Sequence, residues 1–350
     1  MAQLIFFSFL ILSLQVKALS LEYLAEATLS NQTIFEKTKI GGLSSLYYSE
    51  EEKELYALSN DQGTFNKPRF YKFSLSLKKG EMKLEPKAIY FLKSRDPKTL
   101  KLSLSNLQAM APLPWGNFLI SSFGNNNGKP RIVPQILDVK PNGEVVREFP
   151  IPNNFIPEKS GWQNNAGFKG LAAGPSKSFL IAAMAKPLAQ DLKVADQFKD
   201  PNLGQAGWVR FLRYEMPEAW VIRSTREYKY PLDATMEGGG VSQVLLLDEH
   251  RMLVMERSVL TSAKTDLEFQ VRIFLVDLSL AGKTPVLQKT LVLDLVRALS
   301  QMKSPQKVEN YEGMTLGPSL EGGQKTLLLV SDDNFVRKQR THFVAFAIKD

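Results

Sequence analysis

Short apolar runs separated by polar turns dominate the chain, and they recur in pairs. The first run of a pair follows a small polar opening, as in Gly41-Gly42-Leu43-Ser44-Ser45-Leu46 and Gly239-Gly240-Val241-Ser242-Gln243-Val244. The second runs lie at residues 55–58, 118–120, 179–181, 252–255 and 327–330. Because turn-forming residues connect the two runs, each pair predicts a β-hairpin.

The pairs repeat with a period of about 67 residues. Phe168-Lys169-Gly170-Leu171 returns as Tyr311-Glu312-Gly313-Met314, and a further copy is Leu107-Gln108-Ala109-Met110. The equivalent positions are Ser44, Gln108, Lys169, Ser242 and Glu312, at intervals of 64, 61, 73 and 70 residues. A regular period of this kind indicates a repeat architecture.

Two more strands are predicted in most periods. The third begins with an arginine followed by an apolar residue, and these arginines are Arg69, Arg131, Arg210 and Arg272. Fourth strands are expected at 84–92, 145–151, 220–230 and 285–293, while the last period stops after a third strand at 343–348. Residues 21–29 can supply the strand that the last period lacks.

We therefore expect an all-β fold: one β-propeller domain over residues 19–350, with five four-stranded blades closed by the N-terminal strand. Stacked β-sandwiches are the alternative. They would explain the strand alternation, but neither the period nor the short last unit.

Several ordered motifs resemble the phytase-like domain family, also named the esterase-like activity of phytase family. They include Pro68-Arg69-Phe70-Tyr71, Asn165-Ala166-Gly167-Phe168, Met255-Glu256-Arg257, Asn310-Tyr311-Glu312-Gly313-Met314 and Ser331-Asp332-Asp333-Asn334-Phe335. The resemblance covers nearly the whole chain after residue 18. It implies an exported protein that hydrolyses phosphoesters or carboxylic esters.

The repeat itself points to a site on the propeller axis, because the innermost strand of each blade lines the central channel. We expect Glu256, Glu312 and Asp332 to meet there, with Asp61 and Asp333 beside them. Carboxylates that crowd one funnel repel each other unless a cation neutralises them, and Ca²⁺ prefers such oxygen ligands.

This hypothesis assigns a role to each candidate residue. Glu256, Glu312 and Arg257 are the catalytic candidates, and Asp332, Asp333, Glu312 and Asp61 are the candidate calcium ligands. An anionic substrate would be held by Arg69, Arg131, Arg210, Arg272 and Lys169, because guanidinium groups match phosphate oxygens in pairs. The alternative for the arginines is a structural lattice of ion pairs, which packing symmetry would also produce.

Some positions depart from the family pattern, which usually carries acids there. Gln108, Lys169 and the stretch 183–186 are neutral or basic in this chain. A lysine in the channel can pair directly with the remaining acids and make a metal unnecessary. The second function that we consider is therefore a non-catalytic binding propeller, in which the Lys169 side of the channel holds an acidic ligand.

Composition narrows the chemistry further. The 350 residues contain no Cys and two His, which excludes disulfides, cysteine-ligated metals and thiol nucleophiles. The formal net charge of +8 favours an anionic partner, but no run of like charges indicates a nucleic-acid partner.

The apolar stretch 4–14, followed by Val16 and Ala18, predicts a signal peptide over residues 1–18. We expect a secreted or periplasmic monomer with no lasting membrane insertion.

Overall fold

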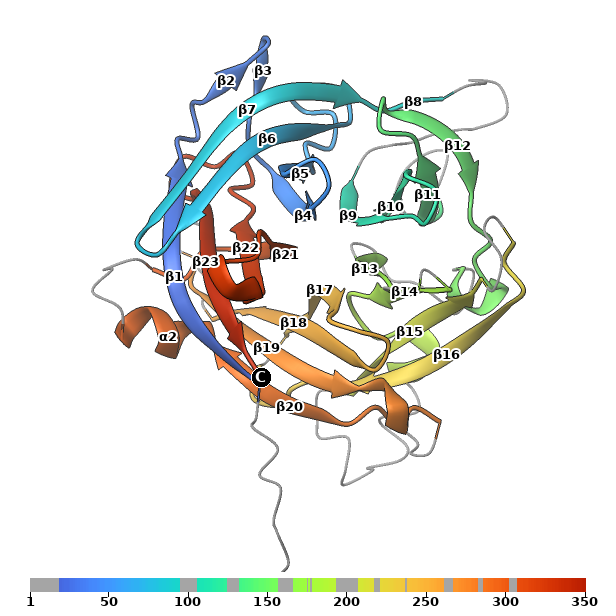
Figure 1. The fold of residues 1–350 in the computed structure, drawn as a ribbon. Coiled ribbons are helices and arrows are strands. Elements are labelled where there is room, and N and C mark those ends of the chain that lie inside the picture. Colours follow the sequence, from blue (N-terminus) through green and yellow to red (C-terminus); the bar gives the residue numbers. More distant parts are fainter. Residues whose placement is uncertain are drawn as a thin grey trace, which may run out of the picture.

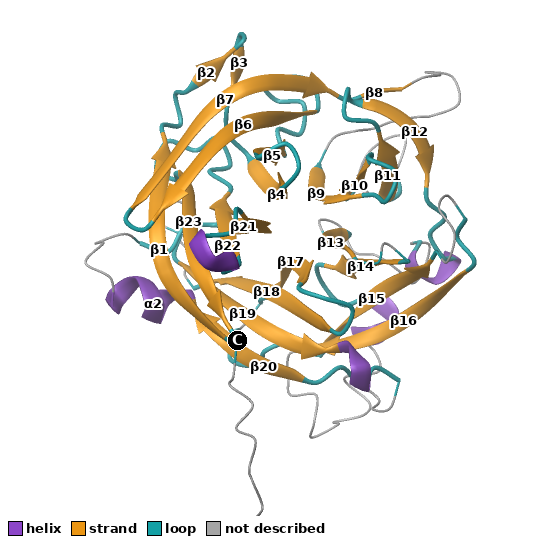
Figure 2. Ribbon diagram, in the orientation of Figure 1, coloured by secondary structure: helices purple, strands orange, loops and turns teal. Residues whose placement is uncertain are grey.

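Antiparallel sheets surround a central axis like the blades of a propeller in the computed structural model (Figure 1). The structure describes residues 19–94, 106–124, 132–156, 166–174, 176, 178–192, 207–216, 221–236, 238–260, 267–282, 286–301 and 307–350. The predicted signal peptide and Arg131 lie outside these ranges. Strands account for most of the architecture, and helices are confined to short segments (Figure 2).

Each blade is one sheet, and the sheets follow each other in chain order. Blade 1 contains β4 (Leu43–Ser49), β5 (Glu54–Ser59), β6 (Arg69–Lys78) and β7 (Glu81–Phe91). Blade 2 contains β9 (Leu107–Pro112), β10 (Phe118–Ser122), β11 (Gln135–Val139) and β12 (Glu144–Glu148), with β8 (Lys93–Ser94) paired in parallel to β12. Blade 3 contains β13 (Phe168–Ala173), β14 (Phe179–Met184), β15 (Trp208–Glu215) and β16 (Ser224–Pro231). Blade 4 contains β17 (Gly240–Leu246), β18 (Arg251–Val259), β19 (Phe269–Asp277) and β20 (Lys289–Asp294).

Blade 5 joins the two ends of the described chain. It contains β21 (Tyr311–Gly317), β22 (Thr326–Ser331) and β23 (Thr341–Lys349), and its outer strand is β1 (Ser20–Leu29). β1 pairs antiparallel with β23 from Ser20 opposite Lys349 to Leu29 opposite Thr341. The predicted propeller of five blades, closed by the N-terminal strand, is confirmed. This closure pairs the edge of β23 that would otherwise be exposed.

The hydrophobic core lies between neighbouring blades, as it does where two sheets pack face to face. Between blades 1 and 2, for example, Tyr56 and Phe70 pack against Phe118 and Ile120. Alternating apolar residues therefore hold the ring together at each blade boundary.

Few elements lie outside the blades. A small hairpin is formed by β2 (Ile34–Phe35) and β3 (Thr38–Lys39), and helix α2 (Leu295–Gln301) follows β20. Short 3-10 turns occur at η1 (Asn153–Phe155), η2 (Leu278–Leu280) and η3 (Glu321–Gly323). None of the helices in the described ranges has the length and apolar character needed to cross a membrane.

Candidate functional site

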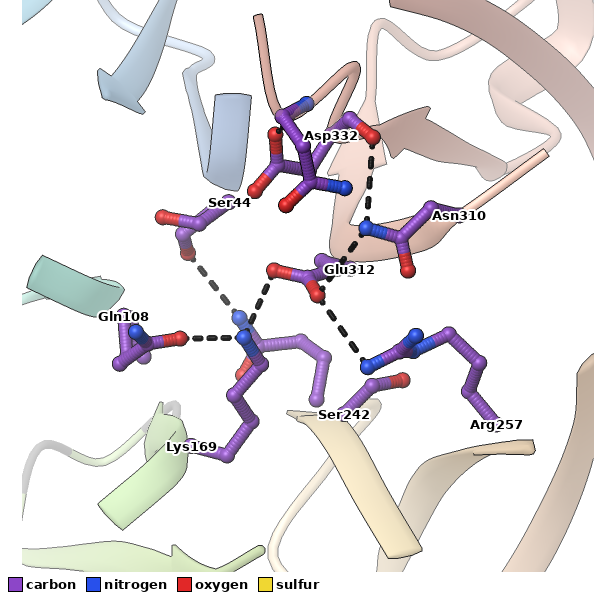
Figure 3. A network of polar contacts seen from close by, with 12 residues as sticks. Ser44, Gln108, Lys169, Ser242, Arg257, Asn310, Glu312 and Asp332 are labelled. Atoms are coloured by element: carbon purple, nitrogen blue, oxygen red, sulfur yellow. Dashed lines mark hydrogen bonds and ion pairs between the residues drawn. The ribbon is translucent and has the colours of Figure 1, made fainter. Parts of the chain in front are cut away.

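A β-bulge interrupts the innermost strand of every blade at the position that the period identifies. In blade 3, for example, Phe168 lies opposite Met184 and Gly170 lies opposite Ala183, so Lys169 between them has no partner in the ladder. The residues left over in this way are Ser44, Gln108, Lys169, Ser242 and Glu312. A bulge re-aims the side chain of its extra residue. We call these five residues the bulge ring, and Figure 3 shows their side chains gathered from all five blades.

The bulge ring is held by an ion pair that crosses the axis. The Nζ atom of Lys169 in blade 3 lies 2.6 Å from Oε2 of Glu312 in blade 5 and also donates a hydrogen bond to the Gln108 amide oxygen. Both charged side chains are buried, with exposed fractions of 7% and 6%. The other carboxylate oxygen of Glu312 faces Nη2 of Arg257 and Nδ2 of Asn310, each at 3.3 Å.

The two carboxyl groups at this end of the channel differ in charge. Burial acts to raise the pKa of Glu312, but the charges of Lys169 and Arg257 outweigh it and hold that pKa below the ordinary value of 4.5. Burial and the neighbouring Glu312 carboxylate raise the pKa of Asp332 to about 8. At neutral pH, Glu312 is therefore ionised while Asp332 carries a proton.

A second set of residues reaches the same channel from the ends of the second strands. In four blades their backbone N–H groups donate to the carbonyl two residues before the bulge, as Asp332 does to Asn310 at 2.9 Å. In blade 4 Arg257 lies opposite Gly240, the corresponding position. The set is Asn60, Phe123, Ala185, Arg257 and Asp332.

This register corrects the expectation that Glu256 shares a cavity with Glu312 and Asp332. Glu256 points the other way, where it accepts hydrogen bonds from the Tyr230 hydroxyl at 2.6 Å and the Asp233 N–H at 2.9 Å. Lys289 completes its surroundings with an ion pair at 2.5 Å. A displacement of one residue along a strand moves a side chain to the opposite face, so Arg257 faces the channel and Glu256 does not.

The other acidic candidates are used within the fold. Asp61 forms a buried ion pair with Arg69 at 2.5 Å and accepts the backbone N–H groups of two following residues. Asp333 accepts hydrogen bonds from the N–H groups of Gly42 at 2.8 Å and Phe335 at 3.1 Å. Neither carboxylate contacts the bulge ring through a hydrogen bond or ion pair of the described residues.

Of the candidate substrate-binding arginines, the three that the structure describes follow the lattice alternative. Arg210 pairs with Asp191 at 2.7 Å and Glu227 at 2.6 Å, both in blade 3 or its connections. Arg272 pairs with Asp233 at 2.7 Å and with Asp294 at 2.9 Å. These guanidinium groups, like that of Arg69, therefore form ion pairs with carboxylates of the blades and of their connecting segments. They are not offered to the channel.

The donor set does not fit Ca²⁺. In the described ranges no group of three or more His, Asp or Glu side chains is placed to hold a metal ion. Six to eight oxygen ligands are usual for this cation. At the bulge ring the ammonium group of Lys169 already neutralises Glu312 directly, as the departure of Lys169 from the family pattern suggested.

A pocket of about 120 Å³ opens beside the bulge ring. Lys169, Lys186 and Arg257 are its charged lining residues, Ser242 and Ser258 add hydroxyl groups, and the part of the chain that the structure describes contributes no carboxylate to the lining. We call it the basic pocket. The Nε atom of Arg257 and the hydroxyl of Ser258 are buried and have no hydrogen-bond partner among the described residues. The wall of the pocket therefore retains unused donor capacity.

Lys186 was not among the candidates from the sequence. Its ammonium group donates hydrogen bonds to the carbonyl oxygens of Gly238 and Gly239, the latter at 2.6 Å. Burial and then the Arg257 charge lower its pKa. A Cβ atom on Gly240 would lie 3.1 Å from the Lys186 stem and 2.3 Å from the Ala185 carbonyl oxygen, so the glycine leaves room for the lysine. The run Gly238-Gly239-Gly240 was the available signal.

Comparisons with known proteins give one family and several distant folds. A family model described as "Phytase-like: Esterase-like activity of phytase" matches residues 38–335. A search among curated proteins found no match. Similar solved structures include the Pseudomonas aeruginosa periplasmic gluconolactonase, with 10% identity and a TM-score of 0.38 over 94% of this chain and 96% of that chain. Another is Cellvibrio cellulosa α-L-arabinanase complexed with arabinohexaose, with 9% identity and a TM-score of 0.42 over 87% and 91%. At this distance neither likeness carries an argument about function.

Proposed function

Because the chain belongs to the phytase-like family, we propose that it is a hydrolase-type propeller that binds an anionic ester in the basic pocket. The family match over residues 38–335 confirms the resemblance inferred from the motifs and supports the hydrolase class. The substrate class is our own inference. It rests on the chemistry of the pocket beside the bulge ring.

The observation that carries this inference is the charge of the basic pocket. Among the described residues three cations and no carboxylate line it, and Glu312 opposes them through contacts with Lys169 and Arg257. Lys186 pays a desolvation cost there, which its lowered pKa reflects. A bound phosphate or carboxylate group would offset this cost and offer acceptors to the Arg257 guanidinium.

Asp332 supplies the proton chemistry of the proposal. Hydrolysis of an ester adds water to the acyl or phosphoryl centre and releases an alcohol that must gain a proton. Asp332 does not line the basic pocket, so it would act through a water molecule; with a pKa of about 8 it is protonated at neutral pH and can donate that proton. The ionised Glu312 is the nearby base for the attacking water, and its lowered pKa makes it a weak one. We therefore expect slow turnover.

The test uses the purified chain with p-nitrophenyl phosphate and p-nitrophenyl acetate, each with added Ca²⁺ and with EDTA. We expect turnover of p-nitrophenyl phosphate, the anionic ester of the two, that chelator does not abolish. Arg257→Gln and Lys186→Gln should weaken inorganic phosphate binding about tenfold each, because each removes a charge-assisted hydrogen bond. Arg226→Gln is the matched control, since Arg226 has a 69% exposed side chain on the outer strand β16.

One observation favours the second candidate, a binding propeller without catalysis. Lys169 engages Glu312 so directly that the carboxylate is a poor base. Phosphate binding that depends on Arg257 and Lys186, with no ester turnover, would support that candidate. Equal phosphate affinity in both variants and the control would contradict anion binding in the basic pocket.

Export belongs to the proposal as well. The apolar stretch 4–14 and the small residues before position 19 support a cleaved signal peptide. Determination of the N-terminal residue of the mature protein tests this, and we expect a chain that begins near Leu19. A protein that retains residues 1–18 after expression in an exporting host would contradict cleavage.

A further inference from the structure

The channel-lining residues of the inner strands change from polar to apolar two residues beyond each bulge. The residues at this position are Leu46, Met110, Leu171, Val244 and Met314. After two more residues come Tyr48, Pro112, Ala173, Leu246 and Leu316. All ten line a cavity of about 350 Å³, which we call the apolar cavity. The channel therefore has a polar end at the bulge ring and an apolar end farther along the same five strands.

The two ends are separate sites. The apolar cavity and the basic pocket share no lining residue. Between them, the side chain of Gln243 donates to the Ser45 hydroxyl at 3.0 Å and accepts from the Leu171 N–H at 3.1 Å, which ties three blades together. The first apolar set is also buried, with Leu171 the most exposed at 3%. A ligand of the apolar cavity is thus not the substrate of the basic pocket.

The charge that the described residues contribute to the apolar cavity is positive. Lys325, which precedes β22, is the one charged residue among the lining residues within the described ranges, and that side chain is exposed. The uncharged polar side chains among the described lining residues come from Thr315 and the two tyrosines of β4. An apolar chamber with a single ammonium group at its rim is complementary to a molecule with an apolar body and one anionic head.

We propose that the apolar cavity binds a medium-chain fatty carboxylate, with its chain against the ring of apolar side chains and its carboxylate toward Lys325. The cavity volume of about 350 Å³ corresponds to about twelve water-sized volumes of 30 Å³. Decanoate has this number of non-hydrogen atoms, so it fills the chamber without requiring the blades to separate. This site goes beyond the proposed hydrolase function and does not depend on it.

The test measures sodium decanoate binding to the full chain by isothermal titration calorimetry, below the concentration at which decanoate forms micelles. We expect one binding site per chain. Ala173→Trp should abolish detectable binding, because the indole fills the chamber from a position that is only partly buried. Lys325→Gln should weaken decanoate binding two- to fivefold and leave binding of 1-decanol unchanged, as expected for an exposed charge contact.

Two controls separate this site from the rest of the molecule. Ala173→Trp must retain the melting temperature and the inorganic phosphate affinity of the unaltered protein, which shows that the fold and the basic pocket are intact. Arg257→Gln should bind decanoate normally. If phosphate binding fails but decanoate binding persists, the proposed function falls and this site stands.

Three results would overturn the proposal. If decanoate does not bind, or binds equally well to Ala173→Trp, then the apolar cavity is not a decanoate site. A Lys325→Gln variant that loses decanol and decanoate affinity equally contradicts the role of the ammonium group. Self-association of the chain that Ala173→Trp abolishes, without decanoate binding, would assign the apolar cavity to a second copy of the protein.

Discussion

Replacing Lys169 with methionine removes the cation that crosses the channel axis while keeping the length of the side chain. Glu312 would then keep only the Arg257 and Asn310 contacts, both at 3.3 Å, in place of the Lys169 contact at 2.6 Å. Breaking a buried ion pair by removing one partner costs about 3–5 kcal/mol. Because two weaker partners remain, we expect the free energy of unfolding at pH 8 to fall by about 3 kcal/mol, at the lower end of that range.

The pH dependence identifies the cause. In the unaltered protein the pKa of Glu312 lies below its ordinary value of 4.5, so the stability it contributes is present above pH 4.5 and is lost as the pH falls through the lower pKa. In Lys169→Met burial dominates and should raise the Glu312 pKa. The free-energy cost of burying the Glu312 carboxylate in this variant then disappears at low pH, where the group is protonated, and grows as the pH rises. The variant should therefore be closer to the unaltered protein at pH 5 than at pH 8.

Urea unfolding at both pH values measures this effect, with a double-mutant cycle as control. The double variant Glu312→Gln, Lys169→Met leaves neither member of this ion pair charged. It should therefore recover most of the stability that Lys169→Met loses, and the cycle should give a coupling energy of about 2–3 kcal/mol. A coupling energy below about 0.5 kcal/mol, or an equal loss at pH 5 and pH 8, would refute the direct contact between these residues across the axis.

Three further predictions concern the same framework. Asp332→Asn should raise the free energy of unfolding at pH 8 and make the decline of that free energy between pH 4 and 8 less steep. The reason is that a carboxyl group with a folded pKa of about 8 destabilises the fold as the pH rises through this interval. A series of thermal melts at different pH values checks this, and unchanged curves would contradict it. Arg69→Met should lower the free energy of unfolding by about 3–5 kcal/mol without changing phosphate affinity, because its fully buried guanidinium pairs with Asp61; urea unfolding and phosphate titration are the measurements. Gly170→Ala should destabilise by about 1–3 kcal/mol, since the new Cβ atom would lie 2.9 Å from the Val244 backbone nitrogen; a variant as stable as the original would show that the inner strands are not so close.

The period could be recognised in the sequence because each blade repeats the same small openings and apolar runs. It placed Lys169 and Glu312 at equivalent positions although they lie 143 residues apart. The same reasoning could not show that they touch, because contact across the axis depends on side-chain length and on the bulge that re-aims both residues. The short last period likewise predicted the closure by β1.

The residues at the ends of the second strands were harder to place from the sequence. The comparison of the repeats placed Glu256 level with Asp332, but Glu256 lies opposite Val241, the residue before the bulge, and its counterpart in blade 5 is Ser331, opposite Tyr311. Arg257, one residue later, is the one that faces the channel. Lys186 follows the end of β14 and lies outside the ladder, so the period assigned it no position. The partners of Arg69 and Arg210 were also hidden, because a repeated arginine serves packing and ligand binding equally well in sequence.

A crystal structure of the chain at neutral pH, grown with inorganic phosphate, tests the central claim most directly. We expect the Lys169 ammonium group in contact with both Glu312 and Gln108 on the axis, and phosphate against Arg257 and Lys186. Side chains of the five bulge positions pointing to separate faces, or a metal ion between Glu312 and Asp332 in place of the lysine, would contradict the account.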